Sequence, residues 1–169
     1  MKRWLLALAL VTPAFPDKTT LVDRATVVTL EKACNKRLET LFDDPYLVLG
    51  LTRGVYLDNY GVVLTAEITL NNAPAITPFR PSVSDAERAS LRKKKLERLP
   101  VLRQAMREML VSFARSVDRL PVGEQVVLGI TLLNRSFEDT AGLPAQIVMQ
   151  GERKSLLAGQ TAAIKVREF

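Results

Sequence analysis

Residues 58–70 read DNYGVVLTAEITL, a turn signal followed by a run in which apolar and mostly polar side chains alternate. This alternation, with a period of two, is typical of a β-strand that has one buried face and one solvated face. The preceding residues 46–57 are rich in Leu, Val and Tyr, so we expect the two runs to pair as an antiparallel hairpin. Gly50 and Gly54 are expected to mark bulges in the first of these strands.

Helical spacing appears on both sides of this hairpin. Between residues 20 and 42, and again between 99 and 120, apolar residues recur at steps of three and four, which is one face of an amphipathic helix. The second helix is expected to open at a capping box that begins with Ser84, and to be kinked or split at Pro100. Cys34 lies within the first stripe, so we expect a buried and unreactive thiol. The stripes consist of Val27, Leu30, Cys34, Leu38 and Leu41, and of Leu99, Leu102, Met106, Met109, Leu110, Phe113, Val117 and Leu120.

The rest of the chain supplies further strands. Alternating or apolar runs predict strands at residues 125–132, 145–150 and 163–169, and a short helix is expected at 152–158. Residues 71–82 contain three prolines and are expected to form a loop. The resulting order, α-β-β-α-β-β-(α)-β, predicts the α+β class, with a mainly antiparallel sheet of about four to five strands and two long helices.

The amino terminus has the layout of a secretory signal. The first three residues carry two positive charges, eight apolar residues follow at 4–11, and a small-residue stretch ends at Ala14. The sequence therefore predicts a signal peptide in residues 1–16, cleaved near Ala14, and a single domain over residues 17–169. The expected location is exported, periplasmic or extracellular, of the bacterial type; the alternative is a cytosolic domain in which this run is a buried first element. The apolar run is too short for the roughly 30 Å core of a bilayer, so we expect no transmembrane span in the mature chain.

Several function classes are excluded by what the chain lacks. It has no histidine, which excludes a Ser-His-Asp or Cys-His site and every zinc motif that contains histidine. Its single cysteine permits neither an internal disulfide nor a thiolate metal site, so we expect no metal and no cofactor. Aromatic residues make up only 6% of the chain, which, together with the expected export, disfavours nucleic acid as a partner. The net charge of +6 favours acidic partners.

A dense run of positive charge opens the second long helix. We call it the basic segment, and it consists of Arg88, Arg92, Lys93, Lys94, Lys95 and Arg98. On a helix these side chains spread over nearly the whole circumference, so we expect the segment to be solvated almost all round. Such a surface would bind an acidic protein or an anionic lipid surface. A solvated arm, whose charges only keep the helix soluble, is the alternative interpretation.

The sequence as a whole favours a small exported binding or assembly domain that is not an enzyme and acts through the basic segment. The alternative is a histidine-free hydrolase that uses carboxylates, or Ser90 activated by Lys93 in an S-x-x-K pattern. A concave pocket with converging carboxylates, or Ser90 and Lys93 half buried together, would favour the enzyme. It is the less favoured class because neither S-D-N nor K-T-G occurs. The loop at 71–82 is a second candidate binding edge. The sequence gives no indication of the oligomeric state.

Overall fold

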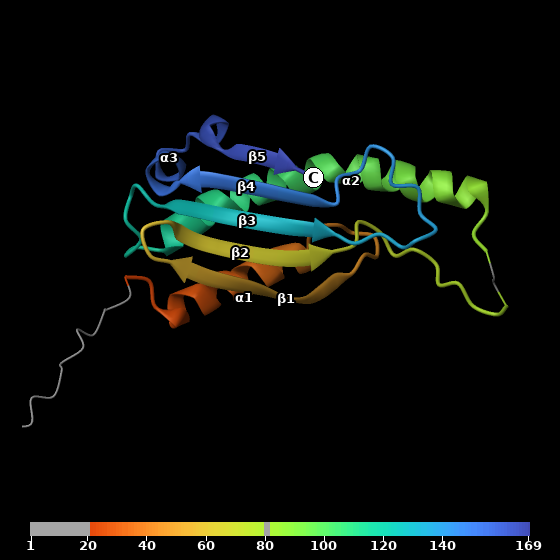
Figure 1. Cartoon of the computed structure of the whole chain (residues 1–169), viewed down its shortest axis with the longest axis horizontal. Coiled ribbons are helices and arrows are strands. Elements are labelled where there is room, and N and C mark those ends of the chain that lie inside the picture. The colour runs from red at the N-terminus through yellow and green to blue at the C-terminus, as the bar shows by residue number, and fades with distance from the viewer. Residues whose placement is uncertain (1–20, 80–81) are drawn as a thin grey trace, which may run out of the picture.

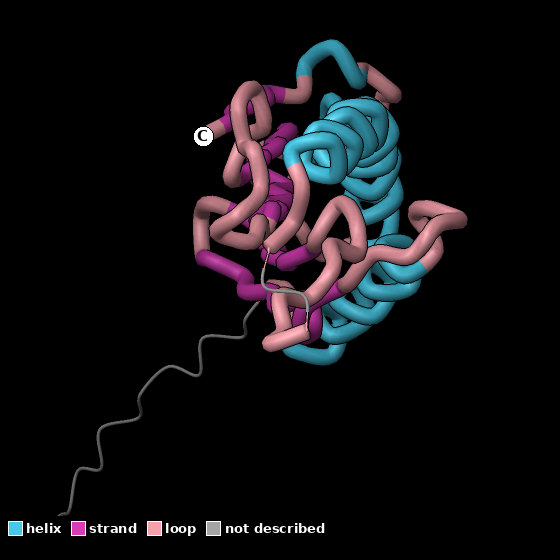
Figure 2. Tube along the Cα trace, turned by 90° about the vertical axis from the view of Figure 1, so that its right-hand side faces the viewer, coloured by secondary structure: helices cyan, strands magenta, loops and turns pink. Residues whose placement is uncertain are grey.

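The fold consists of one five-stranded sheet with two long helices on one of its faces (Figure 1 and Figure 2). The computed structural model describes residues 21–79 and 82–169. The signal peptide predicted in residues 1–16 lies outside the described residues. In the ranges that are described, no helix is long and apolar enough to cross a membrane.

The elements follow the predicted order, and the α+β prediction is confirmed. The first long helix ends at Glu39, before Asp43-Asp44-Pro45, so Leu41, the last residue of its apolar stripe, lies beyond the helix. In chain order the elements are α1 (Arg24–Glu39), β1 (Val48–Leu57), β2 (Gly61–Ile68), α2 (Asp85–Ser116), β3 (Gln125–Leu132), β4 (Gln146–Glu152), α3 (Arg153–Leu157), the 3-10 turn η1 (Thr161–Ala163) and β5 (Lys165–Glu168).

The strands lie in the sheet in the order in which they occur in the sequence, from β1 to β5. The pairs β1–β2, β3–β4 and β4–β5 are antiparallel, as predicted for most of the sheet. The central pair β2–β3 is parallel, with Gly61 opposite Gln125 and Ile68 opposite Leu132. A parallel pair needs a long crossover connection, which α2 provides. The sheet is therefore mixed, and α2 joins its two halves.

The apolar stripes of the sequence meet in one core between the sheet and the helices. In each stripe the predicted inward residues are at most 8% exposed. Cys34 is completely buried, as predicted, and burial raises the pKa of its thiol, which keeps the nucleophilic thiolate scarce. The sheet contributes Val62, Leu64, Ala66, Ile68, Val126, Leu128, Ile130, Leu132, Ile147 and Met149 to this core.

Both long helices begin at side-chain caps. The Asp23 carboxylate accepts a hydrogen bond from the Thr26 N–H at 2.8 Å, and Ser84 and Glu87 form the predicted capping box. Pro100 does not split α2, which runs unbroken over 32 residues. Pro100 lies on the exposed side, where water can reach the carbonyl that loses its helical N–H donor. Of the kink or split expected at Pro100, the split is therefore wrong.

Of Gly50 and Gly54, both of which were expected to mark β-bulges, only Gly50 lies at a bulge. The register of β1 shifts between Leu49 and Arg53, around Gly50, which has a φ of 70°. Gly54 lies in regular pairing instead. A Cβ there would stand 2.7 Å from Cγ1 of Val27. The role of Gly54 is thus to let α1 approach the sheet closely.

Side chains of α1 cover the free edge of β1. The Glu31 carboxylate accepts from the Gly54 N–H at 2.8 Å, and Asn35 Oδ1 accepts from the Thr52 N–H at 2.8 Å. Arg24 forms an ion pair with Glu31 and donates to the Gly54 carbonyl at 3.0 Å. Free N–H groups on an edge strand invite pairing with another chain. The polar side of α1 therefore protects this edge of the sheet.

Candidate functional site

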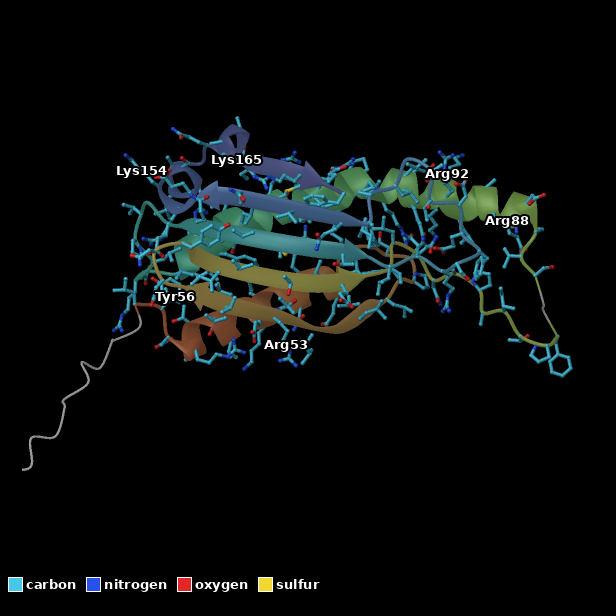
Figure 3. All side chains as sticks on the ribbon, in the orientation of Figure 1. Arg53, Tyr56, Arg88, Arg92, Lys154 and Lys165 are labelled. Atoms are coloured by element: carbon cyan, nitrogen blue, oxygen red, sulfur yellow. The ribbon has the colours of Figure 1, made fainter. Side chains whose placement is uncertain are left out.

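The basic segment occupies the half of α2 that projects beyond the sheet, where Figure 3 shows Arg88 and Arg92, at the far end of the molecule from Lys154. It is not solvated almost all round, as the sequence led us to expect. Lys95 is 1% exposed and Arg98 is 7% exposed. That expectation is wrong for these two residues, because loops that are distant in the sequence fold over them.

Lys95 forms a buried ion pair with the loop between β3 and β4. Its ammonium group contacts the Glu138 carboxylate and lies 2.6 Å from Asn134 Oδ1. The two charged side chains are only 2% and 3% exposed. Glu138 also accepts a hydrogen bond from the Arg135 N–H at 3.0 Å. Lys95 therefore fixes this loop to α2.

Arg98 and Lys94 hold the other side of the helix. The Arg98 guanidinium donates to the Leu70 carbonyl at 2.6 Å, lies 3.2 Å from the Asp44 carboxylate and stacks 4.6 Å from the centre of the Phe42 ring. Lys94 approaches Asp44 to 2.7 Å. Hydrogen bonding from Lys94, helped by both positive charges, lowers the pKa of Asp44. These contacts join α2 to the segments before β1 and after β2.

The three remaining members of the basic segment are more exposed, and each also has a carboxylate neighbour. Arg88 pairs with Asp85, and Lys93 lies 4.0 Å from Glu97. Arg92 donates to the Ala141 carbonyl at 2.8 Å and lies 3.5 Å from Asp139. Five carboxylates thus neighbour the six cations, and Glu87 in the capping box makes the carboxylates six. Within the described residues, the charge of the basic segment is therefore largely compensated.

The side chains of the S-x-x-K pattern do not form a buried pair. The Lys93 side chain is 80% exposed and points to Glu97, so nothing removes it from water. A lysine that activates a serine nucleophile is normally withdrawn from water, so this pair is not arranged for catalysis. A cavity of about 160 Å³ does contain two carboxylates, Asp23 and Asp118. The backbone hydrogen bond from Thr26 lowers the pKa of Asp23, which opposes a role as general acid.

A groove of about 510 Å³ runs along the second half of α2. We call it the α2 groove, and it is lined by Gln104, Arg107, Glu108, Val111, Ser112, Arg115, Ser116 and Thr161. All but Thr161, which belongs to η1, come from successive turns of one helix face, because steps of three and four residues align on a helix. The groove therefore presents two guanidinium groups and several hydroxyl groups along one line.

The arginines of the α2 groove differ from those of the basic segment, because no ion pair joins Arg107 or Arg115 to a carboxylate in the described part of the chain. The groove's own carboxylate, Glu108, accepts from Gln104 at 3.1 Å and from Arg37 at 3.2 Å, and these bonds lower its pKa. Among the described residues, neither guanidinium group of the groove forms an ion pair, although Arg107 also interacts electrostatically with Glu168, the partner of Arg103.

The density of positive charge in the sequence points to the basic segment and not to the α2 groove. The spacing of Arg107, Val111 and Arg115 at steps of four places them on one helix face and was a readable signal. Which cations lack partners is not readable, because the partners come from distant elements. Glu168 of β5, for example, accepts hydrogen bonds from Arg103 at 2.7 and 2.8 Å, whereas Arg107 of the same helix acts on it only through its charge.

Among the described residues, no three acidic or cysteine side chains gather in a way that could hold a metal ion. Comparisons with models of known protein families, with curated proteins and with solved structures found no match for this chain.

Proposed function

We propose that this chain is an exported, non-catalytic binding domain that holds an acidic protein segment in the α2 groove. The observation that carries the proposal is a pair of arginines in a concave site, Arg107 and Arg115, that form no ion pair in the described residues. An acidic partner of the basic segment would have to displace carboxylates of the chain itself, whereas in the α2 groove it would not. A groove on a helix also admits a peptide chain more readily than a flat bilayer.

The spacing of the two arginines suggests the form of the ligand. Eight residues of α-helix separate Arg107 from Arg115 by about 12 Å along the axis. In an extended peptide, side chains four residues apart lie on the same side at about 13 Å. An extended segment with acidic residues four positions apart therefore fits both guanidinium groups. Ser112 lies between the two arginines in the sequence, and its hydroxyl group can form a hydrogen bond with the backbone of the bound peptide.

Binding of a short peptide with two aspartates four positions apart tests this proposal. We expect the double variant Arg107→Gln, Arg115→Gln to bind the peptide about five- to thirtyfold more weakly, because two partly exposed charge pairs are lost. The measurement is fluorescence anisotropy of the labelled peptide. Binding should weaken as salt rises, since exposed charges are screened.

A second double variant, Lys32→Gln, Lys36→Gln, is the matched control. It removes the same charge from exposed positions of α1 that form no ion pair in the described ranges. We expect it to bind as the wild type does. Equal losses in the two double variants would show that only net charge matters, and a wild-type chain that does not bind at low salt would contradict the proposal.

Export is the second part of the proposed function, and residues 1–16 are its basis. In the native host we expect the mature chain to begin near position 15, with residues 1–14 removed. Mass spectrometry of the intact protein measures this directly. A chain that keeps Met1 in the cytosolic fraction would contradict export while leaving the α2 groove untouched.

A further inference from the structure

An uncharged apolar tip precedes α2. We define the apolar tip as residues 75–79, which read AITPF and are all exposed. Ile76 is 50% exposed and Phe79 is 100% exposed. Figure 1 shows the chain after β2 running out beyond the end of the sheet, toward the end where α2 begins. The tip therefore projects from the molecule.

Such a run is unusual on a folded domain. Single exposed apolar residues are common, whereas two large ones gathered in a short projecting segment without charge can mark a contact site. Thr77 is the only polar residue in the apolar tip, and no charged residue occurs between 71 and 79. Pro74 and Pro78 restrict the backbone, so little conformational entropy is lost when the tip is held in place.

We propose that the apolar tip inserts into the interfacial region of a lipid bilayer, with Phe79 as its anchor. The tip is convex, and a bilayer accepts a projecting apolar side chain without a matching pocket. Aromatic rings and aliphatic side chains at this depth bury apolar surface in the acyl boundary. This site lies on a different element from the α2 groove and does not depend on it.

The charges near the apolar tip predict how the contact responds to salt. Carboxylates lie beside every cation of the basic segment, so that segment contributes little net charge, and Arg80 adds one positive charge directly after Phe79 in the sequence. Electrostatic attraction to anionic lipid is then small, and burial of Ile76 and Phe79 supplies the binding. Membrane contact should consequently persist at high salt, unlike peptide binding in the α2 groove.

A dye at the apolar tip tests the proposal site by site. In the full chain, the Ala75→Cys variant can be labelled selectively with an environment-sensitive dye, because the native thiol of Cys34 is buried. Vesicles of phosphatidylethanolamine and phosphatidylglycerol should shift the emission of the dye to the blue, at low and at high salt. Adding Ile76→Ser and Phe79→Ser should weaken the partitioning that this shift reports roughly ten- to hundredfold.

The same dye on the Val122→Cys variant is the control. Val122 is 55% exposed in the turn before β3, at the opposite end of the sheet, and its dye should not respond to vesicles. A dye at position 75 that stays unchanged with vesicles would overturn the proposal. So would a shift that disappears at high salt, or one that appears without vesicles as the protein is concentrated, which would indicate a second copy of the chain as the occupant.

Discussion

The Lys95→Ala variant is expected to lose about 3–5 kcal/mol of unfolding free energy, because it leaves the Glu138 carboxylate buried and without its cation. The lost hydrogen bond to Asn134 adds to the effect, since a buried polar group without a partner is costly. Urea denaturation followed by circular dichroism measures the change. Such a loss would be a large part of the stability of a domain of this size.

Two further variants show whether the buried charge is the cause. Lys93→Ala removes an exposed cation from the same helix and should change the stability by no more than about 0.5 kcal/mol. Replacing both partners, Lys95→Met with Glu138→Leu, should recover most of the loss, since apolar substitutes for a buried ion pair are tolerated. If Lys95→Ala is as mild as Lys93→Ala, Lys95 is not buried in solution.

The Gly61→Ala variant is expected to lose about 3–5 kcal/mol of unfolding free energy. Gly61 begins β2 with a φ of 137°, a conformation that side-chain-bearing residues rarely adopt. A Cβ there would stand 1.9 Å from the Gln125 carbonyl oxygen. That atom belongs to the backbone of the neighbouring strand, so it cannot move without disturbing the parallel β2–β3 pair. Thermal unfolding measures the loss.

Gly123→Ala is the matched control for this prediction. Gly123 lies in the turn before β3, has no neighbouring atom within 4 Å of a Cβ and does not have a positive φ. Alanine at position 123 should leave the stability unchanged or raise it by about 0.4–1 kcal/mol, because it lowers the conformational entropy of the unfolded chain. A Gly61→Ala variant as stable as Gly123→Ala would show that the register of β2 and β3 differs from the one described.

The fold followed closely from local patterns. The alternation of residues 62–70 predicted β2, and the steps of three and four between residues 99 and 120 predicted the buried face of α2. Both signals are local, because the pleat of a strand and the pitch of a helix fix which side chains share a face. The parallel pairing of β2 with β3 is not local: it joins strands that are separated by the whole of α2.

The candidate site was predicted less well from the sequence than the fold was, and the basic segment shows the reason. Its positive charge was evident from the sequence, but its exposure was not. Asp44 approaches Arg98 from a position 54 residues earlier in the chain, and Glu138 approaches Lys95 from a position 43 residues later. Local patterns carry no information on such contacts. The basic segment therefore resembled a binding surface in the sequence, although most of its cations contact carboxylates of the same chain.

By itself, the sequence determined the helices, the strands, the face that each one buries and the chemistries that are excluded by the lack of histidine and by a single cysteine. Only the tertiary structure decided which positively charged side chains are not paired within the chain and can therefore bind a partner. Arg107 and Arg115 form no ion pair in the described ranges, whereas Lys95 and Arg98 are enclosed by loops. The physical reason is that periodicity acts between neighbours along the chain, while the availability of a charge depends on every group that folding brings within a few ångströms of it.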